Sequence, residues 1–327
     1  MTAALAPQAT TESTPTSVFN AFLALVAFSF WRQWRVRQMG WVALGLLGIL
    51  TVAVAVLTHG PSGWSLENRF SFRFQMMVRD IPAQLDLLQM TPLPSDGSGI
   101  YMAIFAPFRT ILSDRKFLDD WAFLNFSRWV VFTMHLGFLL PLFTLAYASA
   151  SLGAERESRT MIWLMTRPLP RWSVYLAKFL GGLPWCLLAS GGGFVVLCLA
   201  GGSHGLRALQ TYWPAVVAGT ISFAALFHLI GALFRRPAVV GLVYIFFFET
   251  LVANLPGSLK QLSLNYYVRS LLYNEATATL SVVTPESLDV YAPLDTSSAW
   301  TTLIGVTLVL TLIGSYLFGR QEPQEET

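Results

Sequence analysis

Residues 153–178 read GAERESRTMIWLMTRPLPRWSVYLAK, a charged turn with two prolines that lies between two apolar runs. The runs over 129–150 and 174–200 are each long enough to cross a bilayer, which takes roughly 20 residues of helix. Pro168 and Pro170 lack backbone donors and disfavour helix in the residues before them. The stretch therefore predicts two membrane helices joined by a short polar turn at one membrane surface, where a soluble protein could act on the membrane part.

Composition places the whole chain in the membrane. Of its 327 residues, 54% are hydrophobic and 12% charged, whereas an ordinary soluble domain carries roughly 25% charged residues. The net charge is +3, and the basic residues lie at predicted membrane edges, so nucleic acid is excluded as a partner. Cys186 and Cys198 fall in one apolar run, about 18 Å apart along a helix, which is too far for a disulfide. We predict that they are packing residues.

Apolar runs of spanning length predict an all-α polytopic membrane protein with six transmembrane helices, at 39–58, 129–150, 174–200, 213–234, 238–255 and 300–318. Residues 1–17 lack the basic and apolar regions of a signal peptide and predict a disordered cytoplasmic tail. Residues 18–37 hold only about 13 apolar residues before Trp31, too few to span, and then a Trp/Arg mixture suited to headgroups. We expect an amphipathic interfacial helix there. The alternative, a short true span, would invert every later assignment.

Charge in the short loops sets the orientation. The turns at 151–173 and at Arg235–Arg236 and the tail at 319–327 are expected on the cytoplasmic side, with both termini inside a multi-pass cell-membrane protein. The 201–212 turn and the 256–299 loop carry few basic residues and are expected outside, as the positive-inside rule requires.

The 59–128 segment is the largest expected external loop. It carries seven basic and seven acidic residues, and loops longer than about 60 residues translocate largely regardless of charge. Stretches such as FSFRFQMMV at 70–78 alternate as strands do, between clusters of proline and glycine. The segment therefore predicts a small mixed extracytoplasmic subdomain between the first two spans.

Three residues inside predicted spans are candidates for a translocation path. Glu249 lies near the outer end of the fifth span, where a carboxyl group is costly unless it faces the bundle interior or reaches the interface. His135 lies early in the second span, and Pro141 should kink that span. The alternative is that all three are structural: His135 a hydrogen-bonded packing residue, Pro141 a tolerated membrane proline and Glu249 a carboxyl group at a helix end. The same two interpretations apply to His228 in the fourth span.

The polar turn carries a pattern found in a known family. In chain order, Glu155 or Glu157, Thr160, Leu164, Pro168 or Pro170, Arg171, Tyr175, Leu176 and Lys178 occupy its positions, with Arg159 where the family has a glycine. The pattern resembles the region between the second and third spans of type-two ABC exporter permeases, especially those of multicopper-enzyme maturation and gliding motility.

This resemblance implies a permease that works with a second permease copy, as a homo- or heterodimer, in membrane lipid. A separate ABC ATP-binding subunit would move it through a coupling segment formed by Glu155, Arg156, Glu157, Arg159, Thr160, Pro168, Pro170 and Arg171. The sequence contains no G-x-x-x-x-G-K-[ST] phosphate loop, so we expect ATP to be bound by the partner. We expect no cofactor, no metal site and no catalytic residue in this chain.

Two other classes of function are left open by the residues alone. A membrane-embedded enzyme would need His135, His228 or Glu249 to converge. A structural anchor for extracytoplasmic proteins would use the 59–128 loop as its contact surface.

Overall fold

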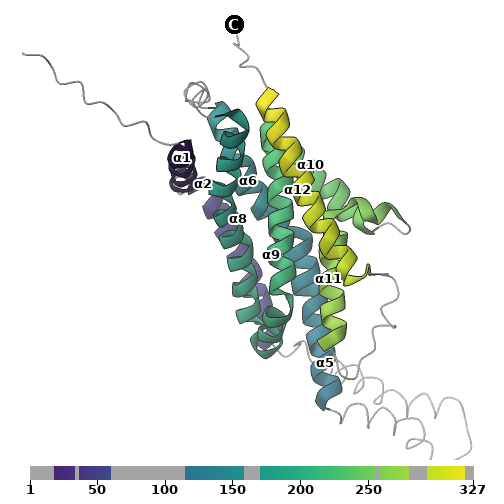
Figure 1. Ribbon diagram of the computed structural model, residues 1–327. Helices are drawn as coiled ribbons and strands as arrows, with labels where there is room; N and C mark the ends of the chain where they lie inside the picture. Colours follow the sequence, from purple (N-terminus) through teal and green to yellow (C-terminus); the bar gives the residue numbers. More distant parts are fainter. Residues whose placement is uncertain are drawn as a thin grey trace, which may run out of the picture.

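The computed structural model describes residues 18–33, 37–59, 115–157, 170–254, 258–279 and 293–320, and these are almost entirely helical. Figure 1 shows the long helices running side by side as an elongated bundle. In chain order the elements are α1 (Val18–Gln33), α2 (Arg37–His59), α5 (Arg115–Phe126), the π-helix η1 (Ser127–Leu139), α6 (Leu140–Glu157), α8 (Arg171–Ala200), α9 (Gly202–Leu233), α10 (Pro237–Tyr244), the π-helix η2 (Ile245–Leu251), the 3₁₀ turns η3 (Val252–Asn254) and η4 (Ser258–Leu262), α11 (Leu264–Thr279) and α12 (Thr296–Arg320).

Within the described residues, four helices are long and apolar enough to cross a membrane: Asp119–Leu152, Arg171–Ala200, Gly202–Leu233 and Thr296–Arg320. Shorter apolar helices cover Val18–Gln33, Leu44–His59 and Pro237–Leu251. The chain is thus an all-α membrane protein over the part that the structure describes. That six helices cross the membrane, with α1 along its surface, stays a prediction.

The helix that contains the second predicted span begins earlier than the sequence predicted. Residues 115–128, predicted as part of the external loop, form α5 and the first two residues of η1, and the helix continues without a break through η1 into α6. Phe123 and Phe126 on α5 are fully buried, and Arg207 of α9 donates to Asp120 at 2.9 Å. Packing against α9 therefore extends the helix beyond its apolar run. The predicted strands of the external loop lie outside the described residues.

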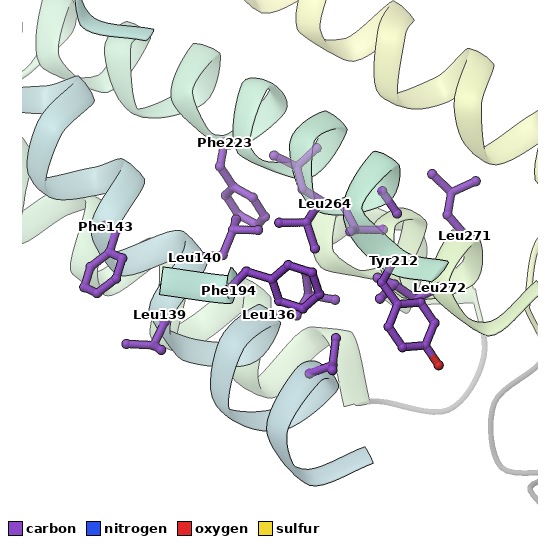
Figure 2. Packing of buried hydrophobic residues seen from close by; sticks show 14 of the residues in the cluster. Leu136, Leu139, Leu140, Phe143, Phe194, Tyr212, Phe223, Leu264, Leu271 and Leu272 are labelled. Carbon is purple, nitrogen blue, oxygen red and sulfur yellow. The ribbon is translucent and has the colours of Figure 1, made fainter. Parts of the chain in front are cut away.

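α9 is the central helix of the bundle and contacts α6, α8, α11 and α12 (Figure 1). Its small residues let neighbours approach closely, as is common between membrane helices. A Cβ added at Gly219 would lie 3.0 Å from Val268 of α11, and one added at Gly231 would lie 3.1 Å from the Ser149 carbonyl oxygen of α6. Figure 2 shows the apolar core built around it from η1, α6, α8, α9 and α11, with labels on Leu136, Leu139, Leu140, Phe143, Phe194, Tyr212, Phe223, Leu264, Leu271 and Leu272.

The turn between α8 and α9 is much shorter than the predicted 201–212. α8 ends at Ala200 and α9 begins at Gly202, whose φ of +62° is a left-handed conformation that favours glycine. A Cβ added at Gly205 would lie 1.9 Å from the carbonyl oxygen of Cys198, so only glycine fits there. The glycines thus allow the chain to reverse within about two residues. Cys198 and Cys186 are both buried and unbonded, as predicted for packing residues.

The fifth predicted span, 238–255, is helical without interruption through Asn254, but its hydrogen-bond register changes from α to π to 3₁₀ along the way. It consists of α10, η2 and η3, and residues beyond it form the short turn η4 and then the helix α11. α11 falls inside the predicted 256–299 loop, yet it packs on α9 and α12 and contributes Leu264, Val268 and Leu272 to the core. The C-terminal half of the bundle is therefore more helical than the loop assignment predicted.

Candidate functional site

The two ends of the predicted coupling segment lie on neighbouring helices. α6 ends at Glu157, so Glu155, Arg156 and Glu157 form its last residues, and α8 begins at Arg171. Pro170 immediately precedes α8 in an extended conformation, with φ −62° and ψ 137°. Its carbonyl oxygen accepts hydrogen bonds from the backbone N–H and the hydroxyl of Ser173 at 2.9 and 2.7 Å. A new helix therefore starts directly after the proline, as the sequence predicted.

Other residues of the predicted segment are not described. Arg159, Thr160 and Pro168 lie outside the described residues, between the end of α6 and the start of α8.

A buried histidine joins three helices just inside the bundle from this segment. His228 of α9 has one ring nitrogen, Nδ1, 2.9 Å from the hydroxyl oxygen of Ser151 on α6. Its other nitrogen, Nε2, lies 3.2 Å from the carbonyl oxygen of Tyr175 on α8. Ser151 is about two turns before the end of α6 and Tyr175 about one turn after the start of α8. The parts of α6 and α8 that flank the coupling segment are thus hydrogen-bonded to the same side chain of the central helix.

Tyr175 extends this connection to α12. Its ring centroid lies 4.5 Å from that of His228 and 6.0 Å from that of Phe318. A Cβ added at Gly314 of α12 would lie 2.1 Å from the tyrosine oxygen, so the side chain packs directly on the backbone of α12. The buried Tyr175 side chain therefore connects the first turn of α8 to both α9 and α12.

The N-terminal helix α1 is fixed across α8 and α6 at the same end of the bundle. The indole N–H of Trp185 donates to the Phe30 carbonyl oxygen at 3.0 Å, and their rings stack with centroids 5.3 Å apart. The amide of Gln33 donates to the Tyr147 carbonyl oxygen at 2.6 Å. A Cβ added at Gly181 would lie 2.7 Å from the Cβ of Ser29, so the two helices touch at their backbones.

Lys178, the last residue of the family pattern, is buried beneath α1. Its side chain is 1% exposed, and its Nζ atom lies 6.0 Å from the ring centroid of Phe28. A buried cation needs compensating contacts, and the aromatic face of α1 supplies one of them. The pattern residues Tyr175 and Lys178 therefore join α8 to two different neighbours.

Of the path candidates, His135 is fully buried in η1 with its ring centroid 5.1 Å from that of Phe194. Neither ring nitrogen has a hydrogen-bond partner among the described residues. His135 is therefore a packing residue, but it lacks the hydrogen bond that the structural interpretation predicted. Pro141 lies at the second residue of α6, directly after the π-helical stretch. Proline lacks the N–H that a continuous α-helix would use, and a π-helical register before it is one way to accommodate that loss.

Glu249, in the π-helical part of the fifth segment, joins that segment to α11. Its carboxyl oxygens accept from the Tyr244 hydroxyl at 2.7 Å and the Ser263 hydroxyl at 2.6 Å. They also accept from the backbone N–H groups of Leu264 and Asn265 at 3.1 and 2.9 Å, the first two of α11. These are donors that a helix start leaves without partners, so the carboxyl group caps the helix.

The described contacts do not bring together His135, Glu249 and His228, the residues that a membrane-embedded enzyme would need to converge. His135 packs on α8, Glu249 binds the start of α11, and His228 binds Ser151 and Tyr175. Among the described residues there is also no group of three metal-ligating side chains. Sequence reasoning missed the roles of Ser151 and Ser263. Their only signal is a hydroxyl within or beside an apolar helix, because the partners are far away in sequence.

Comparison with known proteins identifies the central part of the chain. Residues 98–254 match the family described as ABC-2 family transporter protein. No curated protein matched the chain. The matched residues run from the segment before α5 to the end of η3 and include the whole polar turn between α6 and α8, so the resemblance stated from that turn is confirmed. Residues 98–254 are therefore similar to the transmembrane permeases of the ABC-2 transporter family.

Proposed function

We propose that the chain is the membrane-spanning subunit of an ATP-driven ABC exporter, moved by a separate ATP-binding subunit through residues 153–171. The similarity of residues 98–254 to a permease family supports a transport role and an ABC ATP-binding partner. The observation that carries the coupling proposal is that the helices on either side of this segment are both hydrogen-bonded to His228, through Ser151 on α6 and Tyr175 on α8.

In this mechanism, binding of ATP brings two partner subunits together beneath the membrane and displaces the segment. The displacement reaches α6 through its last turns and α8 through its first turn. The His228 hydrogen bonds and the Tyr175 packing pass it to α9 and α12, while α1 holds α8 from the side. A second copy of the chain completes the path, and the helices rearrange across the seam between the copies.

The test is purification of the tagged full chain from its own membrane in mild detergent, with ATP hydrolysis and co-purifying proteins as readouts. We expect a subunit that contains a phosphate-binding loop, and ATP hydrolysis that follows it. Replacing Glu157 and Arg159 together by alanine should abolish both. A chain that is stable and active alone, with no such subunit, would contradict the proposal.

A matched control is the replacement of Glu275 by alanine. Glu275 is an exposed charged residue on α11, at the other end of the bundle from the polar turn. We expect this variant to retain the co-purifying subunit and its ATP hydrolysis. Equal loss in both variants would mean that general destabilisation, and not the coupling segment, explains the result.

A further inference from the structure

Asn265 on α11 is a buried polar side chain whose amide group is not matched by its surroundings. Its exposed fraction is 0%, and neither the amide nitrogen nor the amide oxygen has a hydrogen-bond partner among the described residues. Its backbone N–H is satisfied separately, by the carboxyl group of Glu249 at 2.9 Å. Burying an amide without hydrogen bonds is costly, and buried polar groups in native proteins are matched by protein or by ordered water. The amide of Asn265 therefore indicates a ligand.

A second polar group is left without its usual partner by Pro141. The backbone N–H of Leu140, directly after η1, donates to the carbonyl oxygen of His135, five residues earlier. In the same π-helical register, the next bond would run from residue 141 to the carbonyl oxygen of Leu136. Residue 141 is a proline and has no N–H, so Leu136 does not receive that bond. The junction between η1 and α6 thus carries a backbone acceptor that its own helix does not satisfy.

The direction of α11 places the two groups near each other. Arg207 of α9 donates to the carbonyl oxygen of Thr279, the last residue of α11, and to Asp120 of α5, both at 2.9 Å. Arg269 lies nearer the start of α11 and faces η1, with its Nη2 atom 3.7 Å from the position of a Cβ added at Gly137. α11 is therefore antiparallel to the continuous helix formed by α5 and η1.

Asn265 lies one helical turn before Arg269, on the same face of α11. Because the helices are antiparallel, that turn carries Asn265 past Gly137 in the direction of Pro141. Helix carbonyl groups point towards the C-terminal end of their helix, so the Leu136 oxygen is directed to the same level. Gly137 adds no side chain to this contact, which leaves room between the two backbones. The amide and the free acceptor thus occupy one level of the contact between α11 and η1.

A ligand that satisfies both groups must donate and accept. The Leu136 carbonyl and the Asn265 amide oxygen are acceptors, and the Asn265 amide nitrogen is a donor. A metal ion could bind the two oxygens but not the N–H groups, and an anion could bind the N–H groups but not the oxygens. Water does both, and buried waters typically form about three hydrogen bonds with such groups. We propose that a water molecule bound by Asn265 and Leu136 joins α11 to the junction of η1 and α6.

The first test is the sign of the change in Tm for Asn265→Leu, measured by thermal unfolding of the full chain in detergent. Leucine would raise Tm if the amide had no ligand, because it removes an unmatched group. A bound water reverses the sign, and we expect Tm to fall by about 3 °C or more. In the Pro141→Ala background the new N–H can bond to Leu136, so the same substitution should cost less than half as much. A rise in Tm, or equal losses in both backgrounds, would overturn the proposal.

The matched control is Asn274→Leu on the same helix. The Asn274 amide donates to the Leu294 carbonyl oxygen at 2.8 Å and to the Thr296 hydroxyl at 3.0 Å, so its partners belong to the protein. Its loss of Tm should be the same with and without Pro141→Ala. If the control depended on Pro141 as strongly as Asn265→Leu does, the coupling would be a general effect of the proline and the proposal would be wrong.

Direct detection decides the question even if the variants fail to fold. The full chain is labelled with ¹⁵N-asparagine in phosphatidylcholine vesicles, and transfer of magnetisation from water is measured by solid-state NMR. We expect transfer to the Asn265 side-chain amide, which is identified by its absence in the conservative variant Asn265→Asp. Transfer only from lipid protons, or none at all, would overturn the proposal. No ATPase is present in these measurements, so their outcome is independent of the proposed transport function.

Discussion

At the scale of single residues, the buried carboxyl of Glu249 shows how the structure decides between two interpretations of one sequence feature. An acidic residue in an apolar helix is a functional candidate by default. Here its two oxygens accept four hydrogen bonds, and Ser263 in turn accepts from the Tyr266 backbone N–H at 3.3 Å. Together Glu249 and Ser263 satisfy three donors of the first turn of α11. The contacts therefore favour a structural role for Glu249.

We predict that Glu249→Leu destabilises the protein, while Glu249→Gln does so less. Leucine leaves buried hydroxyl and N–H donors without an acceptor, and each costs about 1–3 kcal/mol. In a thermal unfolding measurement in detergent, the Leu variant should lose about 5 °C or more in Tm. The exposed residue Glu275 on the same helix supplies the control, since Glu275→Leu should change Tm little. An unchanged Tm in Glu249→Leu would refute the capping role.

At the scale of elements, the contact of α1 with α8 depends on one glycine. A Cβ at Gly181 would meet the Cβ of Ser29 at 2.7 Å and the Val26 carbonyl oxygen at 2.8 Å, and backbone cannot move aside cheaply. A Cβ at Gly191, on the same helix, would meet nothing within 4 Å. The two positions therefore separate the effect of the contact from the general effect of removing a glycine from a helix.

We predict opposite signs for the two substitutions. Gly181→Ala should lower stability by about 1–3 kcal/mol, because it overpacks the contact. Gly191→Ala should raise it by up to about 1 kcal/mol, because alanine is the better helix former. Thermal unfolding of the two variants under one condition measures both. If both variants were stabilised equally, α1 would not be packed on α8 at this glycine.

The start of α12 predicts a local dependence on pH. The Asp295 carboxylate accepts from the backbone N–H and the hydroxyl of Ser297 at 3.2 and 2.5 Å, and these hydrogen bonds lower the pKa of Asp295 below its ordinary value. A lowered pKa stabilises the folded turn above the unfolded pKa, and the effect is lost as pH falls through the folded pKa. Protection of the Ser297 amide against hydrogen exchange, corrected for its intrinsic rate, should therefore fall below about pH 4.

The variant Asp295→Asn is the control for this dependence. Its side chain keeps an oxygen acceptor but does not titrate, so its protection should not change over the same range of pH. The prediction fails if the unaltered protein and the Asn variant show the same pH profile.

At the scale of the whole molecule, apolar runs predicted where most long helices lie but not how the remainder is built. The helices α2, α8 and α12 cover the runs at 39–58, 174–200 and 300–318 to within a few residues. An apolar run shows that a helix is long enough to cross the hydrocarbon core, but it does not show which other helices pack against it. α11, with Asn265, Arg269 and Asn274, is too polar to be recognised as a buried helix, and its burial comes from α9 and α12. The early start of α5 has the same cause.

The candidate site likewise contains one feature that the sequence predicts and one that it does not. Prolines act on neighbouring residues, so the start of α8 after Pro170 could be predicted from the sequence. The hydrogen bonds of His228 to Ser151 and Tyr175 could not be predicted. These two partners lie 77 and 53 positions from His228 in the chain, and no local pattern encodes such contacts. The contacts that join the helices beside the coupling segment are therefore known only from the packed structure.

The central claim is that residues 153–171 receive the push of a cytoplasmic motor subunit, and one measurement tests it most directly. A photo-reactive amino acid is placed at Trp163 in the full chain, and intact cells are illuminated before the products are identified. The account predicts a cross-link to a protein with a phosphate-binding loop, and none from the same amino acid placed at Trp213. A cross-link from position 163 only to extracytoplasmic proteins, or to no other protein, would contradict it.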